Sequence, residues 1–354
     1  MQSSPHLPQL SSLSNHQQLN VVRDQTQNKA EDASIPPCYY NWIYKLLIRL
    51  PHLLDNLSIL AFVSFPTLHP QFIRLVSCFK TVKALGLWDS SGQSFSEIIQ
   101  LINRLPQLIF LYIEGMKWDR PARFFPSQQL RLEQLTCSLT SNRMRADVLD
   151  WLGSLQHLSG LRCLEILSLE SHDMSKVHHI LNRYTHSLRF LDLASRTADI
   201  FESLSLSSLS QLECLGIRIS PSPFRNHSAL FSSCISQLLT PSLVYVNIGY
   251  FENLDPESFA VSQSDWKNVD DVLSDSKFNR LTYFVMNLHS EDEGIPVRNT
   301  LRATFKTIFP KSYKRRILWV AKSGGNSEHR AFHICEEDEH DFNMDELANS
   351  YSRM

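Results

Sequence analysis

One spacing of apolar residues recurs along most of the chain and limits the folds that it can adopt. In each copy an apolar residue is followed by two variable positions, a second apolar residue, one variable position and a third apolar residue. The clearest copies begin at Leu108, Leu164, Leu188 and Leu212, and weaker copies begin at Leu54, Val82, Leu132, Leu243 and Leu281. Neighbouring first positions are 24 residues (108 to 132) to 38 residues (243 to 281) apart. The chain is therefore built from short similar segments that follow one another at a nearly regular interval.

This L-x-x-L-x-L pattern is typical of the strand of a leucine-rich repeat, whose period is about 20–29 residues. Between the copies the apolar residues change to helical spacing. The segments with this spacing are Phe95–Ile102, Met144–Leu152, Val177–Tyr184, Leu230–Leu239, Val269–Leu273 and Val297–Phe309. One strand and one helix cannot bury both apolar faces alone, so neighbouring repeats must stack. The sequence predicts an α/β leucine-rich-repeat solenoid, a curved parallel sheet with helices on its outer side.

Composition divides the chain into three parts. Residues 1–37 are rich in Ser, Gln, Asn and His, which predicts a disordered polar tail. Residues 38–322 are predicted to form the solenoid with its caps, the first between 39 and 50 and the last strand at Ile317–Val320. Residues 323–354 contain the acidic run from Glu336 to Asp341 and are predicted to be a second disordered tail.

Charge, hydropathy and cysteine usage exclude several classes of partner. Lys and Arg total 34 against 36 Asp and Glu, so no whole-protein field attracts nucleic acid or anionic lipid. The basic cluster between Lys311 and Arg316 is interpreted as a charged turn. The longest apolar stretch, around 57–65, is too short to cross a bilayer, and no secretory signal is visible at the N-terminus. The 7 cysteines contain no CxxC pair, which favours reduced thiols and an intracellular protein, cytoplasmic or nuclear.

No recognised catalytic or metal motif occurs. The chain has no G-x-S-x-G elbow, no phosphate-binding G-x-x-x-x-G-K-[ST] loop and no H-E-x-x-H helix. His329, His333, Cys335 and His340 are close in sequence, but a second ligand pair at zinc-finger distance is missing, so a solvated tail is the preferred interpretation. We therefore expect a protein that is not an enzyme and that has no cofactor and no metal site.

Variable positions within the strands are the candidate binding residues. Alternate strand residues point away from the helices, so they line the concave face of the predicted sheet. The candidates for binding a protein or peptide there are Trp88, Phe110, Tyr112, Glu114, Glu170, Phe190, Asp192, Arg218, Tyr245, Asn247 and Tyr283. Large aromatic residues mixed with single charges are typical of protein-binding surfaces. The alternative is that these rings pack on one another across neighbouring strands and serve only the fold.

The repeats, with helices that end in Leu-Pro at Leu50-Pro51 and Leu105-Pro106, resemble the leucine-rich-repeat part of fungal F-box-like proteins. The resemblance implies a module that recognises a protein as the substrate of a ubiquitin ligase. In that family a helical F-box near the N-terminus binds a Skp-type adaptor. No Leu-Pro-x-Glu opening precedes residue 50 here, so binding of a Skp-type adaptor is not expected. The alternative function is a structural or regulatory scaffold that uses its convex helices and has no link to ubiquitin ligases.

Overall fold

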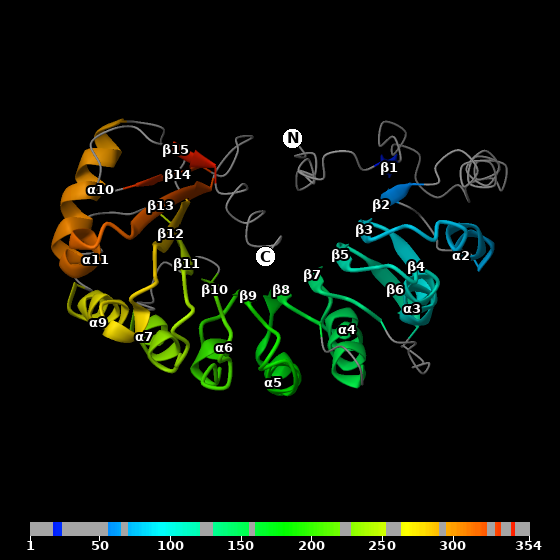
Figure 1. Ribbon diagram of the computed structural model, residues 1–354, viewed down its shortest axis with the longest axis horizontal. Coiled ribbons are helices and arrows are strands. Elements are labelled where there is room, and N and C mark those ends of the chain that lie inside the picture. The colour runs from blue at the N-terminus through cyan, green and yellow to red at the C-terminus, as the bar shows by residue number, and fades with distance from the viewer. Residues whose placement is uncertain are drawn as a thin grey trace. The chain divides into compact units, whose positions relative to one another are not determined.

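A computed structural model describes ten segments of the chain. They are residues 17–22, 56–64, 70–120, 130–155, 160–219, 228–252, 263–289, 295–323, 330–333 and 341–343. Contacts divide the chain into two compact units. The N-terminal unit comprises residues 13–161, and the C-terminal unit comprises residues 162–354 together with 1–12. In both units parallel strands alternate with helices along the chain (Figure 1).

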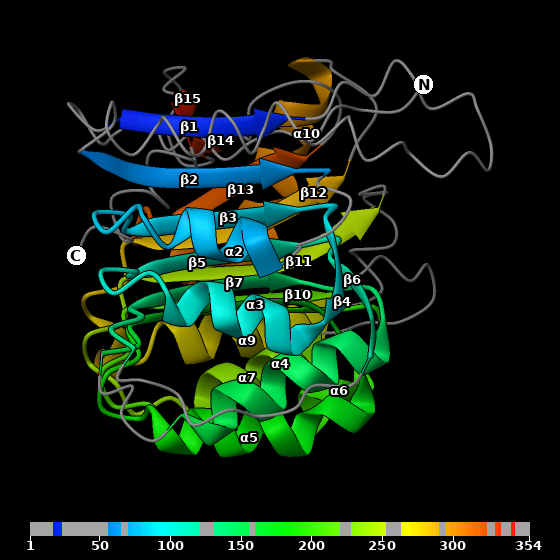
Figure 2. The ribbon, with the colours of Figure 1, turned by 90° about the vertical axis from the view of Figure 1, so that its right-hand side faces the viewer.

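In the described residues of the N-terminal unit, five parallel strands belong to the main sheet. In spatial order they are β1 (Gln17–Val22), β2 (Leu57–Val63), β3 (Ala84–Trp88), β5 (Phe110–Glu114) and β7 (Gln134–Ser138). The helices are α2 (Pro70–Val76), α3 (Phe95–Asn103) and α4 (Asn142–Ser154), which lie on one face of this sheet (Figure 2). Two short strands, β4 (Ser91–Ser94) and β6 (Lys117–Arg120), pair in parallel as a second small sheet.

The C-terminal unit continues the same alternation. Its parallel strands are β8 (Cys163–Leu169), β9 (Phe190–Ser195), β10 (Cys214–Ile219), β11 (Tyr245–Glu252), β12 (Tyr283–His289) and β13 (Leu318–Ser323). After β13 the chain adds two antiparallel strands, β14 (Arg330–His333) and β15 (Asp341–Asn343). The helices are η4 (Ser171–Asp173), α5 (Met174–Arg183), α6 (Asp199–Glu202), α7 (Ser228–Ser236), α9 (Gln263–Leu273), η5 (Ser276–Phe278), α10 (Ile295–Ile308) and α11 (Pro310–Lys314). In Figure 1 they lie on one face of the strands.

Strand register stacks the apolar residues of the repeats into a continuous core within each unit. Leu85 pairs with Leu111 and Leu111 with Leu135 in the N-terminal unit, and all three are buried. The same position in the C-terminal unit pairs Leu191 with Leu215, also buried. Because these side chains face the helices, each repeat buries its apolar residues against its neighbours. The predicted fold, an α/β leucine-rich-repeat solenoid, is confirmed.

Two of the predicted strand positions are wrong by three residues. Cys163 pairs with Phe190, so the residue equivalent to Leu188 is Leu161 and not Leu164. Ile59 pairs with Ala84, so the equivalent of Val82 is Leu57 and not Leu54. In both places a leucine lies three residues from another leucine, so the L-x-x-L spacing can start at either one. Pairing with the next strand decides the register.

The predicted tails contain strands, so their boundaries require correction. The strand β1 lies within the predicted polar tail 1–37 and pairs with β2, and β14 and β15 lie within the predicted tail 323–354. A sheet edge offers a row of unpaired N–H and C=O groups, which neighbouring chain satisfies even where its average composition is polar. The remainder of both tails and the predicted N-terminal cap at 39–50 lie outside the described residues.

The basic cluster before β13 holds three helices together. Asp270, which is buried in α9, accepts hydrogen bonds from the backbone N–H groups of Lys311 (2.9 Å) and Ser312 (2.8 Å) at the start of α11. The Arg315 guanidinium donates to the carbonyl oxygens of Leu273 (2.6 Å) and Phe278 (2.7 Å). The cluster was interpreted as a charged turn, but Lys311 and Lys314 lie in the short helix α11, and Arg315 and Arg316 follow it directly. Among the helices that the structure describes, none has the length and apolar character needed to cross a membrane.

Candidate protein-binding surface

The face of each sheet that is not covered by helices presents alternate residues of the strands, and we call it the helix-free face. Ten of the eleven predicted binding residues lie in strands and alternate with buried core residues, which places them on this face. The exception is Glu170, which follows β8.

In the N-terminal unit the predicted rings pack on each other. The Trp88 and Tyr112 rings stack with centroids 4.8 Å apart, and Trp88 is 3% exposed between Tyr112 and Val63. The Trp88 ring lies over Gly86, where any Cβ would overlap it. The Tyr112 hydroxyl donates to Glu114 Oε2 at 2.5 Å. Trp88 is therefore a packing residue, as the alternative interpretation expects, whereas Phe110, Tyr112 and Glu114 remain partly exposed.

In the C-terminal unit three charged residues on neighbouring strands form an ion-pair cluster. Arg218 Nε donates to Asp192 Oδ1 (2.9 Å), and Arg218 Nη2 lies 2.7 Å from both Asp192 Oδ2 and Glu165 Oε1. The strand register places Glu165, Asp192 and Gly216 side by side on β8, β9 and β10. A Cβ at Gly216 would lie 2.6 Å from Asp192 Cγ, so only glycine leaves room for this carboxylate beside β10. The side chains of Arg218, Asp192 and Glu165 are 16%, 11% and 25% exposed, so the cluster is half-buried and carries two negative charges for one positive charge.

Aromatic rings extend this surface toward β13. The ring centroids of Tyr245 and Tyr283 are 6.5 Å apart, and those of Tyr283 and Trp319 are 5.7 Å apart. Tyr245 is buried with Cys214 below the partly exposed rings, which also include Phe190. Burial raises the pKa of the Tyr245 phenol, which therefore stays neutral at physiological pH.

An amide pair completes this surface. Asn287 Nδ2 donates to Asn247 Oδ1 at 2.7 Å, which joins β12 to β11. Asn247 is thus on the helix-free face, as predicted. The assignment of both amide groups follows from this hydrogen bond.

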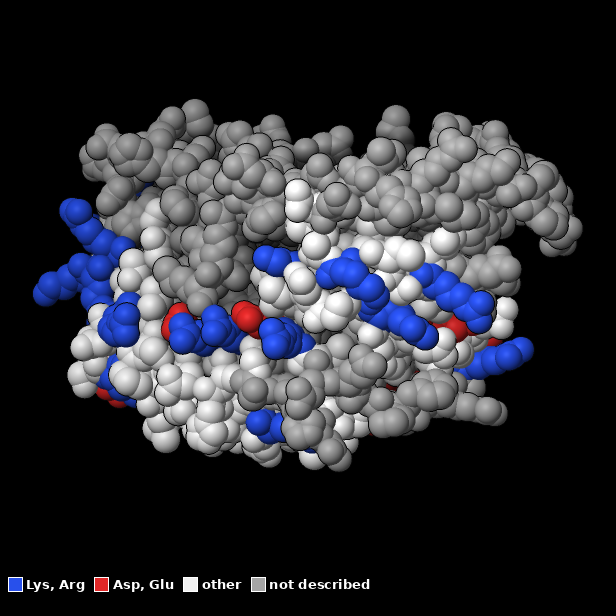
Figure 3. Space-filling model, turned by 45° about the vertical axis from the view of Figure 1, so that its right-hand side comes forward, with Lys and Arg blue, Asp and Glu red and all other residues white. Residues whose placement is uncertain are grey.

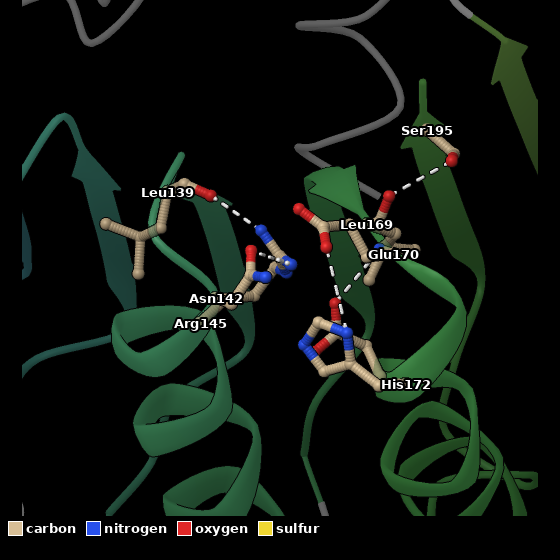
Figure 4. A network of polar contacts seen from close by, with 8 residues as sticks. Leu139, Asn142, Arg145, Leu169, Glu170, His172 and Ser195 are labelled. Carbon is tan, nitrogen blue, oxygen red and sulfur yellow. Dashed lines mark hydrogen bonds and ion pairs between the residues drawn. The ribbon is translucent and has the colours of Figure 1, made fainter. Parts of the chain in front are cut away.

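Glu170 follows β8 and caps η4 instead of lying in a strand, and Glu165 is the glutamate of β8 beside Asp192. Glu170 forms a capping box with Asp173 at the start of η4, in which its backbone N–H donates to Asp173 Oδ2 at 3.0 Å (Figure 4). His172 Nδ1 lies 3.7 Å from Glu170 Oε2. The error follows from the three-residue register difference at β8, since a strand alternates its faces every residue. Ser168, with φ of 66°, interrupts that alternation.

Three side chains that the structure adds to this surface were not among the predicted residues, and they are Glu165, Asn287 and Trp319. Glu165 follows from the corrected register of β8. Trp319 lies in the segment predicted as the last strand, and alternation with Leu318 and Val320 places it on the helix-free face. The pattern that identified the other candidates was therefore sufficient to find Trp319.

Figure 4 also shows a buried arginine of the N-terminal unit. Arg145 in α4 donates from Nη1 to the Leu139 carbonyl oxygen and from Nη2 to Asn142 Oδ1, both at 3.1 Å. It is 1% exposed, so its charge is held by hydrogen bonds inside the fold.

The described cysteines form no disulfide, and all of them except Cys78 are buried. Burial raises the pKa of Cys163 and Cys214, and it raises the pKa of Cys234 to about 12. The thiolate is the reactive form, so these side chains act as small apolar core residues at neutral pH. Within the described residues no group of three or more His, Cys, Asp or Glu side chains is arranged to hold a metal ion.

No protein-family model and no characterised protein sequence matches the chain. Among solved structures it is similar to an internalin C2 from Listeria monocytogenes, with 16% identity over 67% of this chain and 83% of that chain, and a TM-score of 0.32. At that score the likeness does not define the fold, which rests on the repeats and strand pairings described above.

Proposed function

We propose that this chain is a protein-binding leucine-rich-repeat module and that the helix-free face of its C-terminal unit is the binding surface. The observation that carries the proposal is the joint presence of the Arg218 ion-pair cluster and the partly exposed rings Phe190, Tyr283 and Trp319 on neighbouring strands. Arg, Tyr and Trp are enriched among the residues that dominate binding energy in protein interfaces.

The ion-pair cluster supports the proposal because its geometry is fixed before binding. Asp192 receives two contacts from the Arg218 guanidinium, which is the bidentate arrangement that holds both side chains in one orientation. A side chain that is already ordered loses little conformational entropy when a partner binds. The excess of one carboxylate favours a partner segment that presents a cationic or N–H donor group.

A similar set of side chains occurs in the N-terminal unit. Phe110, Tyr112 and Glu114 are partly exposed on the helix-free face of β5. We propose them as a further contact set because they combine aromatic rings with a charge.

The resemblance to F-box-like proteins implies a more specific function, substrate recognition in a ubiquitin ligase. This function rests on sequence resemblance alone. The scaffold alternative assigns partner binding to the helices. The helix-free face and the outer surface of the helices can be compared directly in the full-length chain. Both carry side chains whose replacement leaves the buried core unchanged.

The experiment is selection of a random peptide library on the full-length chain, followed by calorimetric titration of the enriched synthetic peptides. We expect Tyr283→Ala and Trp319→Ala to weaken binding of those peptides by tenfold or more, the scale of about 1.4 kcal/mol for one anchor residue. The matched helical control is Lys267→Ala with Asn268→Ala, both exposed on α9, which should leave affinity unchanged. Loss of binding in the helical control with retention in the Tyr283 and Trp319 variants would favour the scaffold instead.

A further inference from the structure

The strand-entry edge of the N-terminal unit carries four exposed cations, and we propose that this edge binds an acidic segment of a partner protein. The edge consists of the described turns that lead into β3, β5 and β7, residues 77–83, 104–109 and 130–133. Lys80, Lys83, Arg104 and Arg131 are exposed there, and Glu133 is the one carboxylate in these turns. We refer to these four side chains as the basic edge.

Backbone hydrogen bonds fix the order of the turns. The N–H groups of Ile109 (2.8 Å) and Phe110 (2.9 Å) both donate to the Lys83 carbonyl oxygen, and the Glu133 N–H donates to the Ile109 carbonyl oxygen at 2.8 Å. The entry points of β3, β5 and β7 therefore lie side by side. Neighbouring strands are about 4.8 Å apart, so the chain positions of Lys83 and Arg131 are separated by roughly 10 Å. An extended peptide that crosses the strands can contact both.

The four cations have no carboxylate partner among the described residues, although the same unit contains other acidic groups. Those groups lie largely at the opposite ends of the strands. Lys83 immediately precedes β3 and Asp89 immediately follows it, and Asp119 lies on β6 beyond the end of β5. In Figure 3, blue Lys and Arg side chains stand out on one side of the molecule with few red Asp and Glu side chains between them. Charges that are separated along the strands, rather than paired, leave a field at the basic edge that attracts anions.

The chemistry of the edge favours a carboxylate-rich peptide over other anions. Single-stranded nucleic acid binds on aromatic side chains that stack its bases, and the exposed residues of the basic edge include none. Binding to a membrane surface is strengthened by exposed apolar side chains that enter the lipid beside the cations. The one exposed large apolar side chain among the described residues is Leu239, in the C-terminal unit. The edge offers point charges and backbone turns, which suit Asp and Glu side chains.

This inference does not depend on the proposed binding surface of the C-terminal unit. It uses different residues, a different edge of the fold and the opposite sign of charge. A variant of one surface is therefore a control for the other.

The test measures fluorescence anisotropy of a labelled oligoglutamate peptide with the full-length chain at low and physiological salt. We expect binding that weakens with salt, and a loss of affinity of about tenfold in the triple variant Lys80→Glu, Lys83→Glu, Arg131→Glu, since each reversal removes one attraction and adds one repulsion. Arg104 is left unchanged because it closes the C-terminus of α3, where a cation also stabilises the helix.

The matched control is Lys117→Glu, Arg120→Glu, Arg143→Glu, three exposed cations of the same unit away from the basic edge. It changes the net charge equally and should alter affinity by less than about twofold. If the reversal variant does not show the circular dichroism of the native chain, the same three positions are changed to Gln.

Three outcomes would overturn the proposal. One is an equal loss in the control, which would mean that only net charge matters. The others are tighter binding of an oligouridylate RNA, or of vesicles that contain phosphatidylserine, than of the peptide, with the same dependence on the three cations.

Discussion

Gly216 offers a test of how the ion-pair cluster is built. The change Gly216→Ala places a Cβ 2.6 Å from both Asp192 Cγ and Oδ1, well inside van der Waals contact. Asp192 must move, and it then loses its contacts of 2.9 and 2.7 Å with Arg218. A hydrogen bond to a charged group stabilises a protein by about 1.5–3 kcal/mol. Alanine offsets about 0.4–1 kcal/mol of this by restricting the unfolded chain. The expected net loss in the free energy of unfolding is about 1–2 kcal/mol.

The same substitution in an Asp192→Ala background should behave differently. The three atoms nearest to the new methyl group all belong to the Asp192 carboxylate, so without it Gly216→Ala should be neutral or stabilising by up to about 1 kcal/mol. Urea unfolding followed by circular dichroism gives the free energies of unfolding of the wild type, the two single variants and the double variant. Equal m-values would show that the four proteins expose the same amount of surface when they unfold. Gly160→Ala is the control, because its Cβ would meet only Glu133 Cγ at 3.9 Å. An equal cost of Gly216→Ala in both backgrounds would refute the reasoning.

Three further predictions follow from other parts of the structure. In native protein at neutral pH a thiol reagent should modify the exposed Cys78 well before Cys163 and Cys214, whose pKa values burial raises; early reaction of either buried thiol would contradict this. Asp270→Ala should lower the free energy of unfolding by about 1–2 kcal/mol, because two N–H groups at the start of α11 lose their acceptor; a change below about 0.5 kcal/mol in urea unfolding would be too small for that role. A purified Skp-type adaptor should not co-elute with the full-length chain in gel filtration, and stable co-elution would show that an F-box function is present.

The order of strands and helices was predictable because it depends on the burial of apolar residues. Leu111 and Leu135 occupy the equivalent position of neighbouring strands, as do Leu191 and Leu215, and all four are buried. Strand register at β8 was not predictable in the same way. Leu161 and Leu164 both begin an acceptable triplet, and the difference decides which glutamate faces away from the helices.

The ion-pair cluster depended on a feature that the repeat pattern does not encode. Arg218 and Asp192 were assigned to the correct face, yet their bidentate contact requires that Gly216 lack a side chain. A single glycine within a strand indicates close approach of another group but does not say which one. The basic edge was likewise hidden, since the charges of the whole chain nearly balance and the turns that carry the cations are apart in sequence.

The strands that follow β13 have a consequence for self-association. A stack of parallel repeats that ends in a long unpaired strand can hydrogen-bond to the first strand of another copy. Head-to-tail pairing of this kind does not form a closed ring, so it can add further copies and grow into a filament. Here the sheet reverses direction after β13 and its strands shorten from 6 to 4 to 3 residues through β14 and β15. The edge strand β15 has three residues, so it offers few ladder hydrogen bonds to a strand of another copy. The shortening of the strands from β13 to β15 therefore works against polymerisation at this end of the sheet.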